Sequence, residues 1–380
     1  MASRPTVIDL FAGAGGLSLG AARAGFDLVG AVEKDPHAFE THKLNFPNSK
    51  HSQSDISGLT GKDLFRQFGL KKGTVTGVIG GPPCQGFSII GRRSLTDTRN
   101  DLFGHFYRLV SEIAPAFFVA ENVPGILNEQ YSELRKQAES QLDGKYVLLE
   151  PFKVKASEYG VPTIRTRVFF IGFNPKKIKK GLTKDDFTTN NPTETVCVKD
   201  ALAGLPEHIS PDWQLVDTDW TTIVKTNGSS FMTKAAGEIP PGIGNKEALE
   251  KYSKLSQISG CQGTTHKTEV IKRFQAVEQG KQDKISKAMK LKPDGFCPTL
   301  RAGTGSDKGS YQAIRPIHYN EPRVITPREA ARLQGFPDWF VFHPTKWHSF
   351  RQIGNSVSPV IAEYLLKIIR AKIDETKSKL

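Results

Sequence analysis

The sequence predicts an α/β protein with a doubly wound, mostly parallel sheet and a second, small irregular domain that contains some β-structure. Short β-branched or apolar runs alternate with amphipathic, helix-like stretches in the first third of the chain, which is typical of βαβ units. A glycine-rich turn follows the first of these runs. After residue 174 the composition shifts to Gly, Ser, Thr and Lys, which indicates a loop-rich insertion.

Five apolar segments are predicted to be strands. They cover residues 6–11, 27–33, 76–83, 115–123 and 167–173. Helices are expected over 17–25, 101–114, 326–336 and 356–373. Thr326 and Pro327 have the pattern of an N-cap followed by a first-turn proline. This order places residues 1–185 plus 323–380 in one α/β domain, with a small irregular domain inserted over 186–322.

Composition limits the kind of protein this is. The chain has 380 residues, of which 38% are hydrophobic and 24% charged, as in ordinary soluble globular proteins. No apolar run is long enough to span a bilayer, and the first residues lack the layout of a signal peptide. Four cysteines form no C-x-x-C pair, so neither a metal site nor a disulfide framework is expected. The predicted location is therefore the cytoplasm.

The charge points to a polyanionic partner. A net charge of +13 favours binding to nucleic acid through counterion release. Charge alone does not separate DNA from RNA or from a membrane surface. The lysine-rich segment 280–292 is a candidate backbone-contacting face, with a solvated helix surface as the alternative.

The glycine turn and two acids predict a cofactor site. Glycines in "DLFAGAGG" (9–16) let the backbone approach a ligand and expose the amides of a helix N-terminus. Glu33 ends the second strand about 20 residues later, where an acid accepts hydrogen bonds from a ribose. Asp55, in "QSDIS", follows a further candidate strand, where it could accept a hydrogen bond from an adenine amino group. The fingerprint G-x-G-x-x-G is broken at Ser18, so the three features favour an adenosine-containing cofactor over a pyrophosphate grip.

Cys84 is a candidate nucleophile, in "VIGGPPCQGFSIIG" (78–91). It follows the C-terminal end of a predicted strand, where doubly wound sheets place their active sites. Glu121 ends another such strand, and Arg165 with Arg167 offers donors and positive charge. The alternative for Cys84 is a buried structural thiol, which we expect for the remaining cysteines, Cys197, Cys261 and Cys297.

Nine sequence blocks, taken in order, resemble the DNA (cytosine-5)-methyltransferases of bacterial restriction–modification systems. They are "DLFAGAGGLSLG", "VEKDP", "SDIS", "GGPPCQGFS", "DTRNDLF", "FVAENVPGIL", "YGVPTIRTRVFFIG", "ITPREAARLQGFPD" and "QIGNSVSP". The stretch from about 186 to 322 lacks such blocks, and this family keeps its variable recognition region there. The resemblance implies the methyltransferase fold that binds S-adenosylmethionine.

The resemblance also implies roles for individual residues. Those matched to the S-adenosylmethionine site are Phe11, Gly13, Ala14, Gly16, Glu33, Asp55, Ile56 and Asn355, and Pro83 is assigned to it as well. The catalytic set is Cys84, Glu121, Arg165 and Arg167. We expect DNA contacts from Gln85, Ser88, Arg92, Arg93, Thr299, Leu300 and Arg301. Thr163 departs from the pattern, because the family commonly has glutamine there.

The expected reaction is transfer of a methyl group from S-adenosylmethionine to C5 of a flipped-out cytosine, through a covalent Cys84 adduct at C6 and without a metal. Duplex DNA is the expected partner of a monomeric enzyme, and a cognate restriction endonuclease is a further candidate partner. Three alternatives stay open: a tRNA cytosine-5 methyltransferase, a catalytically silent DNA-binding relative and a nicotinamide-dependent oxidoreductase. The DNA word is not predicted.

Overall fold

The computed structural model describes residues 4–83, 101–188, 195–209, 220–224, 231, 235, 237–302 and 315–377. Their largest element is an eight-stranded sheet in the order β3-β2-β1-β4-β5-β8-β6, with β7 also paired to β8. The strands are β1 Thr6–Leu10, β2 Asp27–Val32, β3 Lys50–Ser52, β4 Gly77–Gly80, β5 Phe117–Asn122, β6 Val147–Leu148, β7 Phe152–Lys155 and β8 Thr166–Phe173. The predicted α/β class is confirmed.

The sheet is parallel through β1–β5 and antiparallel at one end. β8 runs antiparallel to β5 and also to β6 and β7, whereas β1 to β5 pair in parallel. All five predicted strands occur; four are shorter than predicted, and β8 begins one residue earlier than predicted. Residues 156–165, which begin with η5 (Ala156–Tyr159), join β7 to β8, and this connection is too short for a crossover helix, so β7 and β8 are antiparallel.

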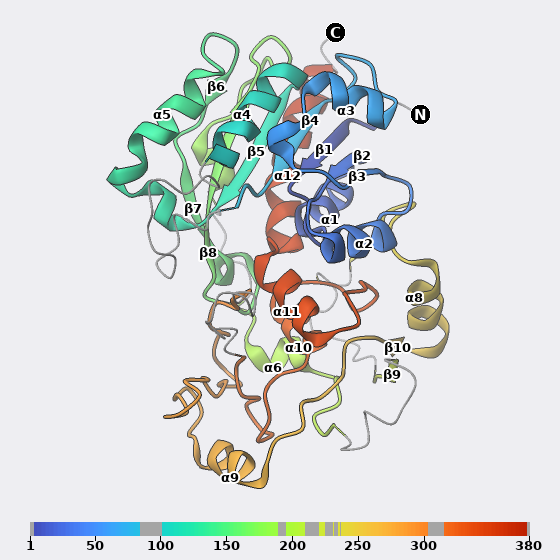
Figure 1. Ribbon diagram of the computed structural model, residues 1–380, viewed down its shortest axis with the longest axis vertical. Coiled ribbons are helices and arrows are strands. Elements are labelled where there is room, and N and C mark those ends of the chain that lie inside the picture. Colours follow the sequence, from blue (N-terminus) through green and yellow to red (C-terminus); the bar gives the residue numbers. More distant parts are fainter. Residues whose placement is uncertain are drawn as a thin grey trace.

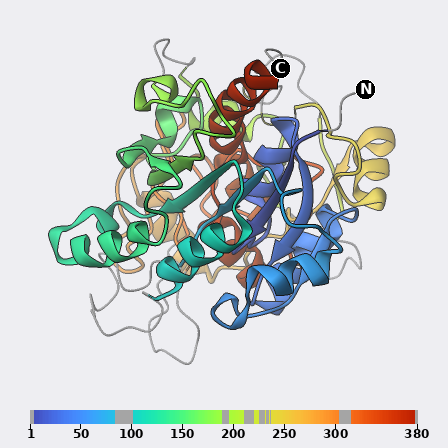
Figure 2. The same ribbon diagram turned by 90° about the horizontal axis from the view of Figure 1, so that it is seen from above.

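Helices cover both faces of the sheet, as Figure 2 shows from above. Alternate strand residues belong to opposite cores: Val7 packs on one face and Ile8 on the other, and Phe117 and Phe118 divide likewise. The first core includes α1 (Gly16–Arg23) and α12 (Pro359–Lys377), and the second includes α3 (Gly61–Phe68), α4 (Asp101–Ile113) and α5 (Ser132–Ser140). The C-terminal helix thus returns to the first part of the chain.

Short elements joined by long loops make up the lower half of the molecule in Figure 1. They include α6 Val198–Leu202, α8 Lys246–Glu250, α9 Thr268–Ala276, α10 Pro327–Leu333, α11 Lys346–Asn355, β9 Thr221–Thr222 and β10 Gln257–Ile258, and α2 (Pro36–Asn45) lies above them. Short turns complete the described elements: η1 Ile56–Gly58, η3 Pro124–Leu127, η4 Glu129–Tyr131, η6 Lys184–Phe187 and the π-helical η8 Lys251–Leu255. The predicted small, irregular region is confirmed, while its boundaries of 186–322 stay a prediction.

Two local expectations can be compared with this region. Thr326 caps α10, accepting a hydrogen bond from Glu329 N at 3.2 Å, as its sequence pattern indicates. The lysine-rich segment 280–292 is irregular and forms no helix, so its interpretation as a helix surface is wrong. Lys290 in this segment is buried, and its ammonium donates to Phe274 O at 3.2 Å.

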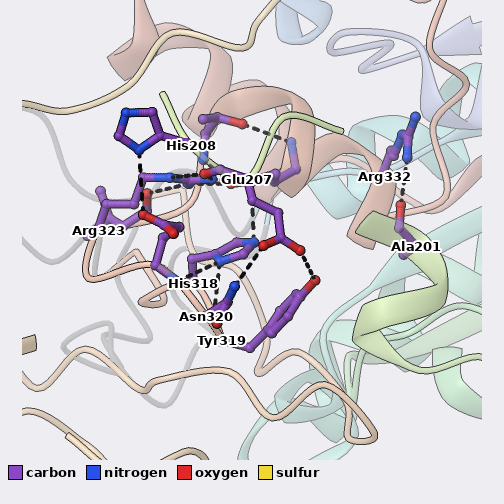
Figure 3. A network of polar contacts seen from close by, with 12 residues as sticks. Ala201, Glu207, His208, His318, Tyr319, Asn320, Arg323 and Arg332 are labelled. Atoms are coloured by element: carbon purple, nitrogen blue, oxygen red, sulfur yellow. Dashed lines mark hydrogen bonds and ion pairs between the residues drawn. The ribbon is translucent and has the colours of Figure 1, made fainter. Parts of the chain in front are cut away.

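A polar network, buried at His318, Arg323 and Glu329 and exposed at Glu207, holds the lower half together (Figure 3). We call it the base network, and its central members are Glu207, His318, Arg323 and Glu329. Arg323 donates from Nη1 and Nη2 to the Glu329 carboxylate at 2.9 and 2.8 Å, and from Nη2 to Glu207 O at 2.7 Å. His318 Nε2 lies 3.7 Å from Glu329 Oε1. The network joins the loop after α6 to the start of α10.

Two expected properties concern cysteine and membranes. Cys197, Cys261 and Cys297 are buried, as predicted. Burial raises the pKa of the Cys297 thiol far above its ordinary value, so this thiol is not a nucleophile at neutral pH. Among the residues that the structure describes, no helix combines the length and the apolar character needed to cross a bilayer.

Candidate active site

The carboxyl ends of β4 and β5 and the amino end of the antiparallel strand β8 bring together the candidate catalytic groups. Glu121 is the fifth residue of β5, and its Oε1 forms an ion pair with Arg167 Nε of β8 at 2.6 Å. The pairing of β5 with β8 places Glu121 opposite Phe169, so Arg167 lies two residues along the neighbouring strand. Both side chains are largely buried, 9% and 14% exposed. The ion pair therefore fixes the carboxylate at the edge of the sheet.

The segment after β4 approaches this carboxylate closely. Asn122 Nδ2 donates to Pro82 O at 3.3 Å, which ties residues 81–83 to the end of β5. A Cβ on Gly81 would lie 3.1 Å from Glu121 Oε2, so only glycine fits beside the acid without displacing it. Cys84, Gln85, Ser88, Arg92 and Arg93 lie outside the described residues, and the chain enters that segment directly after Pro83.

Arg165 has a different environment from Arg167. Its guanidinium is buried, and Nη1 donates to Leu300 O at 3.2 Å and to Gly354 O at 2.8 Å. The two arginines of "TIRTR" therefore contact different partners. Arg167 pairs with the carboxylate, and Arg165 joins the end of α11 to a segment of the predicted recognition region.

Thr163 lies beside the same segment of the predicted recognition region, residues 297–302. Its hydroxyl donates to Cys297 O at 3.0 Å, while Ile164 N donates to that oxygen at 3.0 Å and Cys297 N donates to Pro162 O at 2.8 Å. The short side chain thus contacts the main chain of the recognition segment. Thr163 makes this main-chain contact at a position where the family commonly has glutamine.

Residues 299–301 alternate between solvent and interior. Leu300 is buried, whereas Thr299 and Arg301 are exposed. A Cβ on Gly354 would meet Ala302 N at 2.8 Å, so this segment packs tightly on the end of α11. Thr299 and Arg301 are therefore exposed side chains on a segment that Arg165 and the end of α11 hold in place.

The glycine turn and Glu33 form the candidate cofactor site. Glu33 Oε2 accepts from Gly13 N at 2.8 Å and Oε1 accepts from Asp35 N at 2.7 Å. Burial raises the pKa of the Glu33 carboxyl, and these backbone hydrogen bonds oppose the rise. Each oxygen keeps a second lone pair, so a ribose diol can still donate to this acid. Gly13 has φ +56° and open space where a Cβ would stand, which suits close approach of a ligand.

The second predicted acid, Asp55, is already engaged in hydrogen bonds. Asp55 Oδ2 accepts from Lys34 Nζ at 2.7 Å, and Oδ1 accepts from Ser57 N at 2.9 Å. Together these bonds lower the pKa of Asp55 to about 2, with the Lys34 hydrogen bond as the largest cause. The adjacent Ile56 is buried in the core beneath the sheet. A carboxylate held ionised in this way remains an acceptor for an amino group.

The other predicted cofactor residues have mixed surroundings. Phe11 adopts φ +66°, which is uncommon for a non-glycine residue and occurs at functional turns. Ala14 is buried and Asn355 is exposed at the end of α11. A Cβ on Gly16 would lie 2.1 Å from Val357 O, so this glycine is required by packing between α1 and the segment before α12. Pro83 is half-buried.

A chain of buried polar side chains beneath the glycine turn was not predicted. Ser18 Oγ donates to Asp9 Oδ2 at 2.6 Å and lies 3.0 Å from His42 Nε2, and His42 Nδ1 lies 2.8 Å from His51 Nε2. Burial raises the pKa of Asp9 to about 8, so its carboxyl is mostly protonated at neutral pH. The signal in the sequence was weak, because Ser18 was noted only as the residue that breaks a glycine fingerprint.

Comparison with known proteins connects this geometry to a family. The family model for C-5 cytosine-specific DNA methylases matches residues 5–371. The chain belongs to the C-5 cytosine-specific DNA methylase family. The predicted family and the predicted enzyme class are therefore confirmed, and this methylase is a DNA (cytosine-5)-methyltransferase.

Individual relatives agree with the family. The type II methyltransferase M.XorII of Xanthomonas oryzae is 40% identical over 386 residues, which cover 100% of this chain and 88% of the relative. M1.HphI of Haemophilus parahaemolyticus is 32% identical and covers 96% and 86%. A solved structure from E. coli, described as a prophage-encoded candidate DNA modification methyltransferase, has 52% identity and a TM-score of 0.87, covering 97% of this methylase and 99% of that chain.

Proposed function

We propose that this methylase transfers a methyl group from S-adenosylmethionine to C5 of a cytosine flipped out of duplex DNA, with Cys84 as the nucleophile. The observation that carries the proposal is the Glu121–Arg167 ion pair, 2.6 Å long, at the sheet edge from which the chain leads to Cys84. Relatives named type II methyltransferases support a sequence-specific modification enzyme, and a companion endonuclease belongs to the same proposal.

The chemistry explains why a thiol and a carboxyl are needed together. The Cys84 thiolate adds to C6 of cytosine and makes the ring an enamine, whose C5 is nucleophilic. Glu121 contacts the N3 edge of the ring and stabilises the charge that develops there, with Arg167 holding its carboxyl in place. Removal of the C5 proton after methylation lets the C6–sulfur bond break, which releases Cys84 and restores the aromatic ring.

The residues of the glycine turn fit S-adenosylmethionine. When bound, this group supplies an electrophilic methyl on a sulfonium centre. Glu33, held by Gly13 N and Asp35 N, would accept the ribose hydroxyls, and Asp55 with Ile56 would contact the adenine. Phe11, Ala14, Pro83 and Asn355 complete the proposed set. Gly13 leaves open space for close approach of the ligand.

Recognition of DNA is proposed for the segment that Arg165 and Thr163 fix beside the site. Thr299 and Arg301 are exposed there, while Leu300 O accepts from Arg165. Gln85, Ser88, Arg92 and Arg93 are proposed to contact DNA from the segment after Cys84. Extruding a base costs a few kcal/mol, and phosphate contacts by a chain of net charge +13 offset part of this cost.

Expression in a host without cytosine-5 methylation tests the proposal. We expect 5-methylcytosine at one short DNA word in plasmid from cells with the wild-type methylase. In the purified system, Cys84→Ser should retain S-adenosylmethionine binding and lose methyl transfer by about 10⁴-fold or more, equivalent to over 5 kcal/mol of barrier. Preferred methylation of tRNA over duplex DNA, or substantial turnover by Cys84→Ser, would contradict the proposal.

A further inference from the structure

Three histidines from distant parts of the sequence meet between α2 and α11. His37 lies in the first turn of α2, His343 precedes α11 and His348 lies within it. One ring nitrogen of each lies within 4.8 Å of the others, and His37 Nδ1 is 3.1 Å from His343 Nε2. The ring centroids of His37 and His348 are 3.6 Å apart. All three side chains are half-buried, so solvent and ions can reach them.

This arrangement has the chemistry of a metal-ligand set. Two imidazole nitrogens on one tetrahedral Zn²⁺, at bonds of about 2.0–2.1 Å, lie roughly 3.3 Å from each other, close to the separation of His37 and His343. The neutral imidazole ring is the form of histidine that binds metal.

We propose that His37, His343 and His348 form a binding site for one divalent transition-metal ion, of the class of Zn²⁺, Co²⁺ and Ni²⁺, with water completing its coordination. Imidazole nitrogen suits these ions, whereas Mg²⁺ and Ca²⁺ require oxygen ligands. The sequence alone indicates no metal site, because it contains no C-x-x-C pair and these histidines are up to 311 positions apart. The proposal is independent of the proposed function.

Neighbouring contacts preorganise the three ligands. Arg351 Nη1 donates to Asp35 Oδ2 at 2.8 Å, and Gln352 Nε2 donates to His37 O at 3.0 Å. These bonds already fix α11 against the start of α2, which Figure 1 shows next to each other in the middle of the molecule. A metal ion would therefore join two elements that are held in position without it, so little ordering entropy opposes its binding.

His343 must change its proton arrangement when it binds. Thr345 N donates to His343 Nδ1 at 3.0 Å, so the proton of the neutral ring is on Nε2, next to His37. Coordination through Nε2 moves this proton to Nδ1 and displaces the Thr345 amide, whereas rotation of the ring presents Nδ1 instead. Either change loses one hydrogen bond. His37 and His348 are therefore expected to contribute more to affinity than His343.

The position of the site suggests its structural consequence. Glu33 lies just before α2, where its Oε1 accepts from Asp35 N, and Asn355 ends α11, so proposed cofactor residues lie next to both helices that carry the histidines. A bound ion would stabilise the folded chain by mass action, in proportion to the logarithm of its concentration over the dissociation constant.

Metal titration of the full chain without an affinity tag tests the proposal. Calorimetry with Zn²⁺ should show one saturable site per chain, and Co²⁺ should give the visible absorption of a four-coordinate site without a thiolate charge-transfer band. His348→Gln should weaken Zn²⁺ binding at least tenfold and abolish the Zn²⁺-dependent rise of the unfolding midpoint. His208→Gln is the matched control, because His208 is an exposed histidine outside the cluster, and it should bind as the wild type does.

Two Zn²⁺-binding results would overturn the proposal. One is wild-type protein with no saturable Zn²⁺ site, and the other is His348→Gln with wild-type affinity and midpoint rise. The Co²⁺ spectrum is measured on wild-type protein, so it reports the ligand type even where a histidine variant fails to fold. A thiolate charge-transfer band in that spectrum would assign the ion to a cysteine and contradict the three-histidine site.

Discussion

Two arginine–glutamate pairs in this methylase show how the same side chains produce a scaffold in one region and a site in another. In the base network, Glu329 accepts two hydrogen bonds from Arg323 and one from Thr326 N, and His318 lies beside it. At the sheet edge, Glu121 has Arg167 on one oxygen and faces Gly81 with the other. The saturated pair stabilises the fold, whereas the open pair leaves room for a ligand.

The largest expected effect is on the saturated pair. Glu329→Gln removes the charge that compensates buried Arg323, and breaking a buried pair in this way costs about 3–5 kcal/mol. Urea unfolding should show a corresponding loss of unfolding free energy. Glu247→Gln breaks the exposed pair with Lys251 and is the control, with an expected change of less than about 1 kcal/mol. Equal effects from the two variants would disprove the assignment of Glu329 to the scaffold.

Glu121→Gln should lower turnover strongly and the free energy of unfolding only a little, the opposite of Glu329→Gln. Loss of one transition-state contact lowers turnover by about 10²–10³-fold, equivalent to about 3–4 kcal/mol of barrier. The amide can still accept from Arg167, so the loss of unfolding free energy should be smaller than for Glu329→Gln. Single-turnover methylation and urea unfolding of both variants measure the contrast. Turnover near the wild-type rate would remove Glu121 from the proposed mechanism.

Two glycines of the turn provide a smaller contrast between packing and ligand binding. Gly16→Ala places a Cβ 2.1 Å from Val357 O, and such overpacking costs about 1–3 kcal/mol of stability. Gly13→Ala meets no atom within 4 Å, so its cost is limited to the positive φ, about 1 kcal/mol. We expect Gly13→Ala to weaken S-adenosylmethionine binding, measured by calorimetry, more than its stability loss explains. The reverse order of stability losses would contradict the packing role of Gly16.

The last expected effect is a pH dependence of stability, which is small for each single pH unit. Asp9 has a pKa of about 8 when folded against an ordinary value of 3.8, so the folded state holds a proton that the unfolded state releases. Stability therefore falls as pH rises from about 4 to 8, on the order of 1 kcal/mol per unit at most. Asp9→Asn keeps the acceptor for Ser18 and removes this dependence. Urea midpoints at pH 6 and pH 8 should converge in the variant, and an unchanged pH slope would exclude a protonated Asp9.

Local pattern was sufficient to predict most of the sheet, and long-range contact decided the rest. β1, β2, β4, β5 and β8 were predicted, because apolar runs bounded by turns indicate buried strands without reference to distant residues. The antiparallel direction of β8 depends on how β6 and β7 connect to it. The spacing of apolar residues and the composition of the sequence do not indicate how strands distant in the sequence are connected.

The same distinction applies to the site. The positions of Cys84 and Glu121 after two predicted strands indicated a shared edge, because parallel strands end together. Arg167 reaches the same edge because β8 is antiparallel and begins beside the end of β5. The partners of Arg165 were not predictable, since Leu300 and Gly354 are 135 and 189 positions away. The Asp9–Ser18–His42 chain and the three-histidine cluster were missed for the same reason. Each depends on contacts between elements.

Covalent trapping on DNA tests the central claim most directly. Once the methylated word is mapped, a duplex with 5-fluorocytosine at the target position should form a stable adduct with the wild-type methylase, because fluorine at C5 cannot leave as the proton does. Mass spectrometry should place the adduct on the peptide that contains Cys84, and Cys84→Ser should form none. Glu329→Gln, assayed below its unfolding midpoint, should still be trapped. An adduct on another residue, or none with the wild type, would contradict the account.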